Sequence, residues 1–279
     1  MIRDHMEMMR LPNSVMVGIA VIIGEIVSIR GYPSSSNLMF GFLTGFFISI
    51  SSMILNDYFD VNVDKINSPD RPIPSGRVSK RNALGLGLMI GLLGIFSSLF
   101  LTQLNVIIAI LFWAIAILYD WKGKKIGILG NSMVSMSVAI PYIFGAAALS
   151  KTLDPVILTF FCMSFLANLG REITKDILDI KGDKTINAKT LAITRGPRFA
   201  SLISGLLLIN AILLSPIPLF FDFGITYIIL ILIANSMMGY AAITQLRKNG
   251  ETKSLKIKKV ILLGMLMGLF SFLVGSLYT

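Results

Sequence analysis

Acidic side chains with helical spacing gather at two places in the chain. The first group is spaced i, i+4 and i+8 and the second i, i+3 and i+7, so each group falls on one face of a helix. The two groups are Asn56, Asp60 and Asp64, then Asp176, Asp179 and Asp183. The chain has only 15 acidic residues, and eight of them lie within residues 56–76 and 171–183. Because like charges on one helix face repel, each group is expected to hold something positive.

Magnesium is the cofactor that these two groups predict. Mg²⁺ prefers oxygen ligands, and proteins usually bind it through one or two carboxylates together with substrate phosphates. Two acidic faces opposite each other would bring one ion to each end of a diphosphate. The expected metal ligands are Asp60, Asp64, Asp176, Asp179 and Asp183, and the expected catalytic residues are Asn56, Asp60, Asp64, Asp179 and Asp183. The alternative is that these acids are solvated loop residues paired with nearby lysines.

Basic side chains lie beside both acidic groups and are candidates for binding phosphate. Arg71 stands in the stretch S-P-D-R-P-I-P-S-G at residues 68–76, and Lys122 ends the stretch Y-D-W-K. Arg171 and Lys175 precede the second acidic group. Guanidinium and ammonium groups make charge-assisted hydrogen bonds to phosphate oxygens. We therefore expect these four residues to neutralise the part of the substrate's phosphate charge that the metal ions do not neutralise.

The elements that carry these residues are predicted to be membrane-spanning helices. The chain is 54% hydrophobic and 14% charged, with a mean hydropathy of +0.78, far from the roughly 25% charge of soluble domains. This composition excludes a water-soluble globule and predicts an all-α membrane protein with one integral domain, residues 1–279. The nine candidate spans are 14–30, 38–55, 83–101, 104–118, 131–149, 155–169, 199–219, 224–243 and 259–277. The fourth and sixth are shorter than a bilayer requires, so they are expected to include polar residues at their ends or to be sheltered in the bundle.

The positions of the basic residues predict the topology of these spans. Positive residues concentrate in cytoplasmic loops, and 23 of the 25 lysines and arginines fall on one side when the nine spans alternate. The chain is therefore expected to be a multi-pass protein of the cell membrane, with its N-terminus in the cytoplasm and its C-terminus outside the cell. The net charge of +10 then reflects topology, and no nucleic-acid partner is expected. Both acidic groups emerge on the cytoplasmic side, after the second and sixth spans.

With these motifs in place, the sequence resembles the UbiA-type intramembrane prenyltransferases along nearly its whole length. The pattern N-x-x-x-D-x-x-x-D is met by Asn56, Asp60 and Asp64, and D-x-x-x-D by Asp179 and Asp183. The resemblance implies a bundle of nine transmembrane helices with a central cavity open to lipid and a cap of cytoplasmic loops. It also implies magnesium bridging the aspartates to a prenyl diphosphate, and transfer of the prenyl group to an acceptor.

Two classes of acceptor occur in this family, an aromatic ring and the hydroxyl of a prenylated glycerol phosphate. Residues 9–14 and 171–179 resemble the archaeal-type members that act on glycerol phosphates. That resemblance implies geranylgeranyl diphosphate and geranylgeranylglyceryl phosphate as substrates, joined by the second ether bond of isoprenoid ether lipids. The alternative acceptor is a 4-hydroxybenzoate-like ring of a quinone or haem pathway.

A glycerol phosphate acceptor brings a second phosphate, which needs a binding site of its own. Arg10 lies three residues before Asn13, at the expected start of the first span. Free N–H groups at a helix start favour anions, so Arg10, Asn13 and Ser14 are expected to bind this phosphate. The alternative is that Arg10 only anchors the chain to lipid headgroups.

The role of Glu25 and the class of the protein each have more than one interpretation. A carboxylate within a span costs free energy, so Glu25 is expected to have a structural partner, to contact substrate, or to reach the interface. A lipid transporter would also have membrane lipid as partner and charged loops. Carriers, however, place ionisable groups near the membrane midplane, whereas here they gather at one interface, which favours an enzyme.

Overall fold

The protein is described by a computed structural model that covers residues 2–150, 152, 154–185, 187–247 and 251–277. Within these residues all regular structure is helical, and nine helices are long and apolar enough to cross a membrane. Each of the nine predicted spans overlaps one of them. The prediction of an all-α protein with nine long apolar helices is therefore confirmed.

The long helices form the body of the molecule, and short helices connect them. The long helices are α2 (Leu11–Ile29), α3 (Ser35–Phe59), α5 (Lys80–Ser98), α6 (Gln103–Trp121), α7 (Ile128–Leu149), α8 (Pro155–Thr185), α10 (Pro197–Leu214), α11 (Ile225–Arg247) and α12 (Glu251–Leu277). The short elements are α1 (Ile2–Met9), α4 (Val61–Asn67), η1 (Gly123–Ile126), α9 (Leu191–Thr194) and η2 (Ile217–Phe221), of which η2 completes the seventh span.

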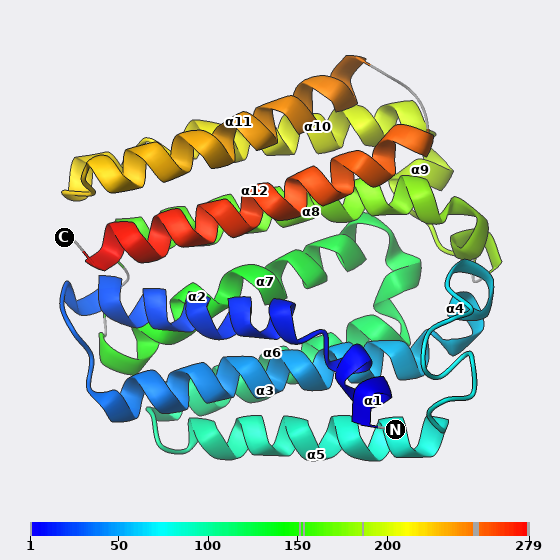
Figure 1. The fold of residues 1–279 in the computed structure, drawn as a ribbon, viewed down its shortest axis with the longest axis horizontal. Helices are drawn as coiled ribbons and strands as arrows, with labels where there is room; N and C mark the ends of the chain where they lie inside the picture. The colour runs from blue at the N-terminus through cyan, green and yellow to red at the C-terminus, as the bar shows by residue number, and fades with distance from the viewer. Residues whose placement is uncertain (1, 151, 153, 186, 248–250, 278–279) are drawn as a thin grey trace.

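The long helices run side by side along the length of the molecule (Figure 1). Helices α3 and α5 pack together at one side and α10 and α11 at the other, while α2, α7, α8 and α12 lie between them. The short helices α4 and α9 lie at one end of the bundle, with α1 toward the same end. The two acidic groups, one at the end of α3 and in α4 and the other in the last turns of α8, therefore lie at a single end of the bundle.

Side-chain caps explain where several spans begin. Ser34, Ser79 and Thr102 precede α3, α5 and α6, and each hydroxyl accepts a hydrogen bond from the backbone N–H three residues later, over 3.1–3.3 Å. A helix start leaves its first N–H groups without backbone acceptors, and serine and threonine satisfy one of them. These caps define the ends of spans that hydropathy alone places only approximately.

The two spans with short apolar runs include polar residues at their ends, as expected. Helix α6 extends to Trp121, beyond the apolar run 104–118, and α8 extends 16 residues past the run 155–169 to Thr185. Only 17% of the apolar stretch of α6 is buried within the protein, whereas 61% of that of α8 is buried. Helix α8 is therefore the interior helix that carries the second acidic group.

Close backbone contact joins α2 to α7, two helices that line the site described below. A side chain at Gly24 would meet the carbonyl oxygen of Tyr142 at 2.1 Å, and one at Gly145 would meet that of Val21 at 2.0 Å. Small residues that let helix backbones approach are typical of membrane bundles. The absence of side chains at these two glycines allows the packing of α2 against α7.

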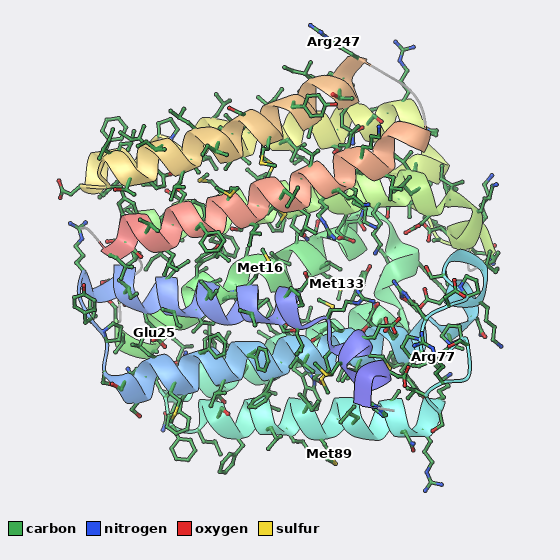
Figure 2. The ribbon with its side chains drawn as sticks, viewed as in Figure 1. Met16, Glu25, Arg77, Met89, Met133 and Arg247 are labelled. Carbon is green, nitrogen blue, oxygen red and sulfur yellow. The ribbon has the colours of Figure 1, made fainter. Side chains whose placement is uncertain are left out.

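Glu25 is fully buried near the end of the bundle opposite α4 and α9 (Figure 2). Neither of its carboxylate oxygens has a hydrogen-bond partner among the described residues. Oε1 of Glu25 lies against Gly41, where a Cβ atom would collide with it. The expected hydrogen-bonding partner is thus not found in the described part of the chain, and full burial contradicts the alternative that Glu25 reaches the interface.

Candidate active site

The two acidic groups line one pocket of about 500 Å³ near the end of the bundle where α4 lies. Eleven of the thirteen residues predicted for the site contribute to its wall: Arg10, Asn13, Asn56, Asp60, Asp64, Arg71, Arg171, Lys175, Asp176, Asp179 and Asp183. They come from the α1–α2 junction, the α3–α4 region and α8. Segments more than 100 residues apart in sequence therefore form opposite sides of one site.

The first acidic group lies on two helices and not on one. Helix α3 ends at Phe59 and α4 begins at Val61, so Asp60 stands at the junction. The helical register is kept, because the N–H of Asp60 bonds to the carbonyl of Asn56 at 2.9 Å and that of Asp64 bonds to Asp60 at 2.8 Å. Asn56, Asp60 and Asp64 consequently all face the pocket despite the break.

The second acidic group lies on the uninterrupted helix α8, as its spacing predicts. Asp176 is buried, and its Oδ2 accepts a hydrogen bond from Nδ2 of Asn131 at 2.7 Å. Asp179 and Asp183 follow one and two turns later and line the same pocket. The helix thus presents three carboxylates to the pocket in a fixed register.

Two arginines stabilise the first acidic group through Asp57 and Asp64. Arg71 donates to Oδ2 of Asp64 at 2.6 Å and lies 3.3 Å from Oδ1 of Asp57, which Arg10 also contacts at 2.6 Å. Burial raises the pKa of the Asp64 carboxyl above its ordinary value, and the Arg71 guanidinium opposes that rise only in part. Asp57 extends the sequence motif but does not line the pocket; it holds the two arginines in place.

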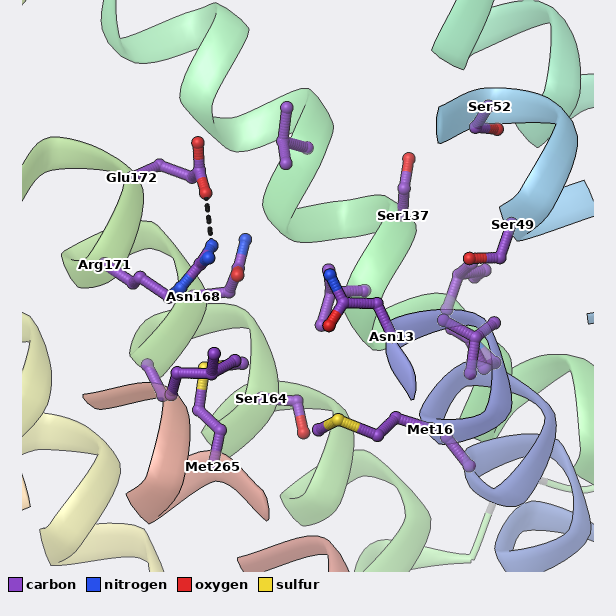
Figure 3. A pocket seen from close by; sticks show the side chains of 18 of the residues that line it. Asn13, Met16, Ser49, Ser52, Ser137, Ser164, Asn168, Arg171, Glu172 and Met265 are labelled. Carbon is purple, nitrogen blue, oxygen red and sulfur yellow. Dashed lines mark hydrogen bonds and ion pairs between the residues drawn. The ribbon is translucent and has the colours of Figure 1, made fainter. Parts of the chain in front are cut away.

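The cations of α8 share one carboxylate that the sequence patterns did not single out. Arg171 donates to Oε1 of Glu172 at 2.7 Å, and Nζ of Lys175 lies 3.4 Å from Oε2 of the same residue. Figure 3 shows the Arg171–Glu172 pair in the pocket, with Asn13 of α2 on another side. Glu172 is 5% exposed, so it fixes the positions of both cations.

Lys122 is a predicted substrate-binding residue that the structure does not place in the pocket wall. Its Nζ lies 4.1 Å from the ring centroid of the neighbouring Trp121. Both side chains are exposed. Helix α6 ends at Trp121, so the chain turns away just before Lys122, and a cation–π contact engages the ammonium instead.

The start of α2 differs from the expectation in one respect. The helix begins at Leu11, and the N–H groups of Asn13 and Ser14 already bond to the carbonyl of Arg10, at 2.9 and 3.4 Å. The hydroxyl of Ser14 is buried and donates to the carbonyl of Met9. Free N–H groups at Asn13 and Ser14 were therefore wrongly predicted, and only Arg10 and Asn13 line the pocket.

Three further polar residues of the site were missed by the sequence analysis. Oδ1 of Asp120 accepts a hydrogen bond from Asn56 at 2.6 Å, Asn131 holds Asp176, and Lys258 of α12 lines the pocket. Asp120 and Asn131 each stand in or beside an apolar run, where a polar side chain is costly unless it has a partner. That cost is the signal that would have identified them.

The donor atoms of the pocket fit magnesium. Among the described residues, no three His, Cys, Asp or Glu side chains converge closely enough to form a metal cage. Mg²⁺ needs no such cage, because it keeps several waters and takes phosphate oxygens as ligands. Carboxylates from residues 60–64 and from α8 line one pocket and supply the oxygen ligands that Mg²⁺ prefers.

An all-helical bundle with nine candidate spans and acidic groups on two sides of a pocket defines a multi-pass membrane protein. Comparison with family models matches residues 17–271 to the UbiA prenyltransferase family. This match covers most of the chain. The chain therefore belongs to the UbiA prenyltransferase family and is a transferase.

Individual relatives agree with this assignment. The digeranylgeranylglyceryl phosphate synthase of Methanosphaera stadtmanae is 34% identical over 98% of this chain and 99% of its own. That of Archaeoglobus fulgidus is 34% identical over 97% and 94%. A solved structure of a digeranylgeranylglyceryl phosphate synthase superposes with a TM-score of 0.78 at 30% identity, covering 100% and 99%. The apo structure of a UbiA homolog from Aeropyrum pernix superposes with a TM-score of 0.73 at 16% identity, covering 92% and 98%.

Proposed function

We propose that the chain transfers a geranylgeranyl group from geranylgeranyl diphosphate to the free hydroxyl of geranylgeranylglyceryl phosphate. The products are diphosphate and the second ether bond of an isoprenoid ether lipid. The observation that carries this proposal is 34% identity over nearly the full length of both chains to the synthase of Methanosphaera stadtmanae. The acidic pocket supports it, because a diphosphate substrate explains why a chain poor in acids places so many there.

The residues proposed to hold Mg²⁺ are Asp60, Asp64, Asp176, Asp179 and Asp183, with Asn56 beside them. When bound, the metal neutralises charge that develops on the departing diphosphate. A UbiA homolog from Archaeoglobus fulgidus is known bound to GPP and Mg²⁺; it is 15% identical to this chain and shares its fold, with a TM-score of 0.63. In this chain, the side-chain amide of Asn56 donates a hydrogen bond to Asp120, which fixes the orientation of that amide.

The protein side chains contribute positive charge and position. Arg71 on one side of the pocket and Arg171 with Lys175 on the other carry the positive charge that the substrate phosphates require. The bond between carbon 1 and the diphosphate oxygen breaks, and its electron pair leaves with the diphosphate. The hydroxyl oxygen of the acceptor then bonds to carbon 1 and loses its proton. Fixed cations favour this step because they need no rearrangement as charge moves.

The remainder of the pocket suits the prenyl chains. Its wall continues along apolar and aromatic side chains that include Met16, Phe112, Tyr142 and Phe272. We propose that this part forms a central cavity open to lipid, so that prenyl chains enter from the membrane without crossing water. Residues 68–79, which carry Arg71, and the segment after α8 would form the cytoplasmic cap over the diphosphate. In this proposal the N-terminus is cytoplasmic, as the distribution of basic residues predicts, and residues 1–279 form one domain.

Product analysis with purified protein tests the proposal. The protein in detergent is incubated with Mg²⁺, geranylgeranyl diphosphate and geranylgeranylglyceryl phosphate. The lipids are then extracted and their masses are determined by mass spectrometry. We expect a product that contains both substrates less diphosphate, and none when EDTA is added. Transfer only to a 4-hydroxybenzoate-like ring would assign the aromatic acceptor instead. No transfer to either acceptor would contradict prenyl transfer, since detergent removes any gradient that transport needs.

A further inference from the structure

The cations of the pocket differ in how well the protein neutralises them. On the α3–α4 side, Arg10 and Arg71 bond to Asp57 and Asp64, so two positive charges meet two negative ones. On the α8–α12 side, Arg171 and Lys175 share Glu172, and Lys258 adds a third positive charge to the same pocket. Asp176, Asp179 and Asp183 of α8 line the same pocket, so this side has no net excess of positive charge. What distinguishes it is that one carboxylate, that of Glu172, serves both Arg171 and Lys175, while Lys258 has no ion pair of its own among the described residues.

Lys258 is the least compensated of these cations. It lies in α12, is half-buried, and has no hydrogen bond or ion pair to any residue that the structure describes. It lies close enough to Arg171 and Lys175, and to the carboxylates of Asp179 and Glu172, to interact with all four charges. Like charges in a partly buried place are costly unless an anion lies between them. The pocket that all three line is the place from which such an anion would come.

Arg171 shows the same lack of a partner at one atom. Its Nη1 is bonded to Glu172, but its Nε is buried and has no hydrogen-bond partner among the described residues. A buried donor that is left unbonded costs free energy, which an acceptor from a ligand would recover. Arg171 and Lys258 thus offer unused donors from two helices to one region of the pocket.

The position of this region separates it from the proposed diphosphate site. Arg171 precedes Asp179 by eight residues, which is about 12 Å along an α-helix. Lys175 lies between them, one turn from Asp179, and remains near the diphosphate. Arg171 is therefore deeper in the bundle than Asp179, with Asn168 and Met265 in the same pocket (Figure 3), and five residues, about 7.5 Å of helix, separate it from Asp176. Lys258 lines this pocket from α12 and is close enough to Arg171 and Asp179 to interact with both charges.

We propose that Lys258 and Arg171 bind the phosphate monoester of the acceptor, at a subsite separate from the diphosphate site. This inference rests on the proposed function, because only a glycerol phosphate acceptor carries this group. In that acceptor the reacting hydroxyl and the phosphate are on neighbouring carbons. Holding the phosphate on the α8–α12 side therefore directs the hydroxyl toward carbon 1 of the prenyl donor. Arg10, already paired with Asp57, does not take this role.

The test compares variants of Lys258 with a neighbouring lysine. Lys258→Gln removes the charge, Lys258→Arg keeps it, and Lys259→Gln is the matched control, since Lys259 is exposed and outside the pocket. We expect Lys258→Gln to raise KM for geranylgeranylglyceryl phosphate about tenfold or more, as loss of a charged hydrogen bond does. KM for geranylgeranyl diphosphate should stay within about twofold, because only acceptor binding is lost. Lys259→Gln should behave as the wild type, and Lys258→Arg should give a KM for geranylgeranylglyceryl phosphate well below that of Lys258→Gln.

An acceptor without phosphate, geranylgeranylglycerol, identifies the group that Lys258 recognises. In the wild type, removal of the phosphate should lower kcat/KM about tenfold or more, by the same lost contact. In Lys258→Gln it should have little further effect, because the partner of the phosphate is already gone. Thermal unfolding of Lys258→Gln, compared with Lys259→Gln, shows whether the fold is intact.

Several outcomes would overturn the inference. Equal increases in KM for both substrates would assign Lys258 to the diphosphate, and unchanged values would remove it from the site. A wild type that uses geranylgeranylglycerol as well as its phosphate would exclude the subsite even if Lys258→Gln did not fold. These results leave ether-bond formation by the wild type intact. A wild type that forms no ether product would instead contradict the proposed function, and the subsite with it.

Discussion

Arg10 donates a hydrogen bond from Nη2 to Oδ1 of Asp57 over 2.6 Å. The pair joins the junction between α1 and α2 to the last turns of α3, 47 residues later in the chain. The Asp57 side chain is 4% exposed and that of Arg10 is 32% exposed. Asp57 also contacts Arg71, so it holds two arginines of the pocket wall in position.

Substitution of either member of this pair should weaken the fold. We expect Arg10→Ala and Asp57→Asn each to lower the free energy of unfolding by about 1–3 kcal/mol, the cost of leaving a buried partner unbonded. The double variant should fall short of the sum of the two, since both remove one interaction. Thermal unfolding in detergent measures these changes, and Arg77→Ala, which breaks exposed ion pairs with Asp4 and Glu7, should have less effect.

The KM values of Arg10→Ala decide between its two possible roles. If Arg10 acts through Asp57, KM for the glycerol phosphate acceptor should not rise more than KM for the prenyl diphosphate. An increase confined to the acceptor would contradict this positioning role and return Arg10 to the acceptor's phosphate.

Loss of one carboxylate from either acidic group should remove most turnover while the fold stays intact. Asp60→Asn and Asp183→Asn each take one negative charge from the proposed metal site and change little volume. Ligands that act as a unit are strongly non-additive, so the double variant should be no worse than the more impaired single variant. Steady-state kinetics over a range of Mg²⁺ concentrations measures this. Asp70→Asn, in an exposed part of the same loop, is the control, and near-normal turnover in both single variants would refute the two-sided metal site.

The contact between α2 and α7 should not tolerate a methyl group. A side chain at Gly145 meets the Val21 carbonyl oxygen at 2.0 Å, whereas at Gly85 of α5 it meets nothing within 4 Å. We expect Gly145→Ala to destabilise the protein by about 1–3 kcal/mol through overpacking. Gly85→Ala should be neutral or stabilising by up to about 1 kcal/mol, as alanine favours a helix over glycine. Equal unfolding temperatures for the two variants would show that α2 and α7 are not in backbone contact.

The spans and the acidic groups were predictable because each follows from a local physical demand. A helix that crosses lipid needs about 20 predominantly apolar residues, and each of the nine long helices contains an apolar stretch of 18 residues. The spacing of Asp176, Asp179 and Asp183 repeats with the helix, and the structure keeps all three on α8. The break at Asp60 was not predictable, because its backbone still follows the helical hydrogen-bond spacing.

Contacts between helices account for what the sequence did not reveal. Asn56 and Asp120 are 64 residues apart, and only the packing of α3 and α6 brings them together. Lys258 belongs to a basic loop whose charges also mark topology, so its place in the pocket cannot be distinguished from its neighbours by sequence. Lys122 was predicted to bind substrate because it lies in a motif. Helix α6 ends just before it, however, and its ammonium group contacts the ring of Trp121.

The orientation in the membrane can be measured with single cysteines. In a Cys162→Ser background, Ser75→Cys lies in the connection between the second and third spans, and Ser36→Cys lies in the first turn of α3, just after the connection between the first and second spans; both positions are exposed. The distribution of basic residues predicts that Ser75 is cytoplasmic and Ser36 external. We expect an impermeant maleimide added to intact cells to label the second variant only, and the first only after lysis. Labelling of both from one side would contradict the nine-span topology.

The choice of acceptor is the most direct test of the whole account. Purified wild-type protein is given Mg²⁺, geranylgeranyl diphosphate and equal concentrations of geranylgeranylglyceryl phosphate and 4-hydroxybenzoate in one reaction. The ratio of the two products by mass spectrometry equals the ratio of the two kcat/KM values. We expect the ether lipid to exceed the aromatic product by at least about 100-fold, because the buried Nε of Arg171 and the ammonium group of Lys258 lack a hydrogen-bond acceptor among the described residues without the acceptor's phosphate. A majority of aromatic product would contradict the account.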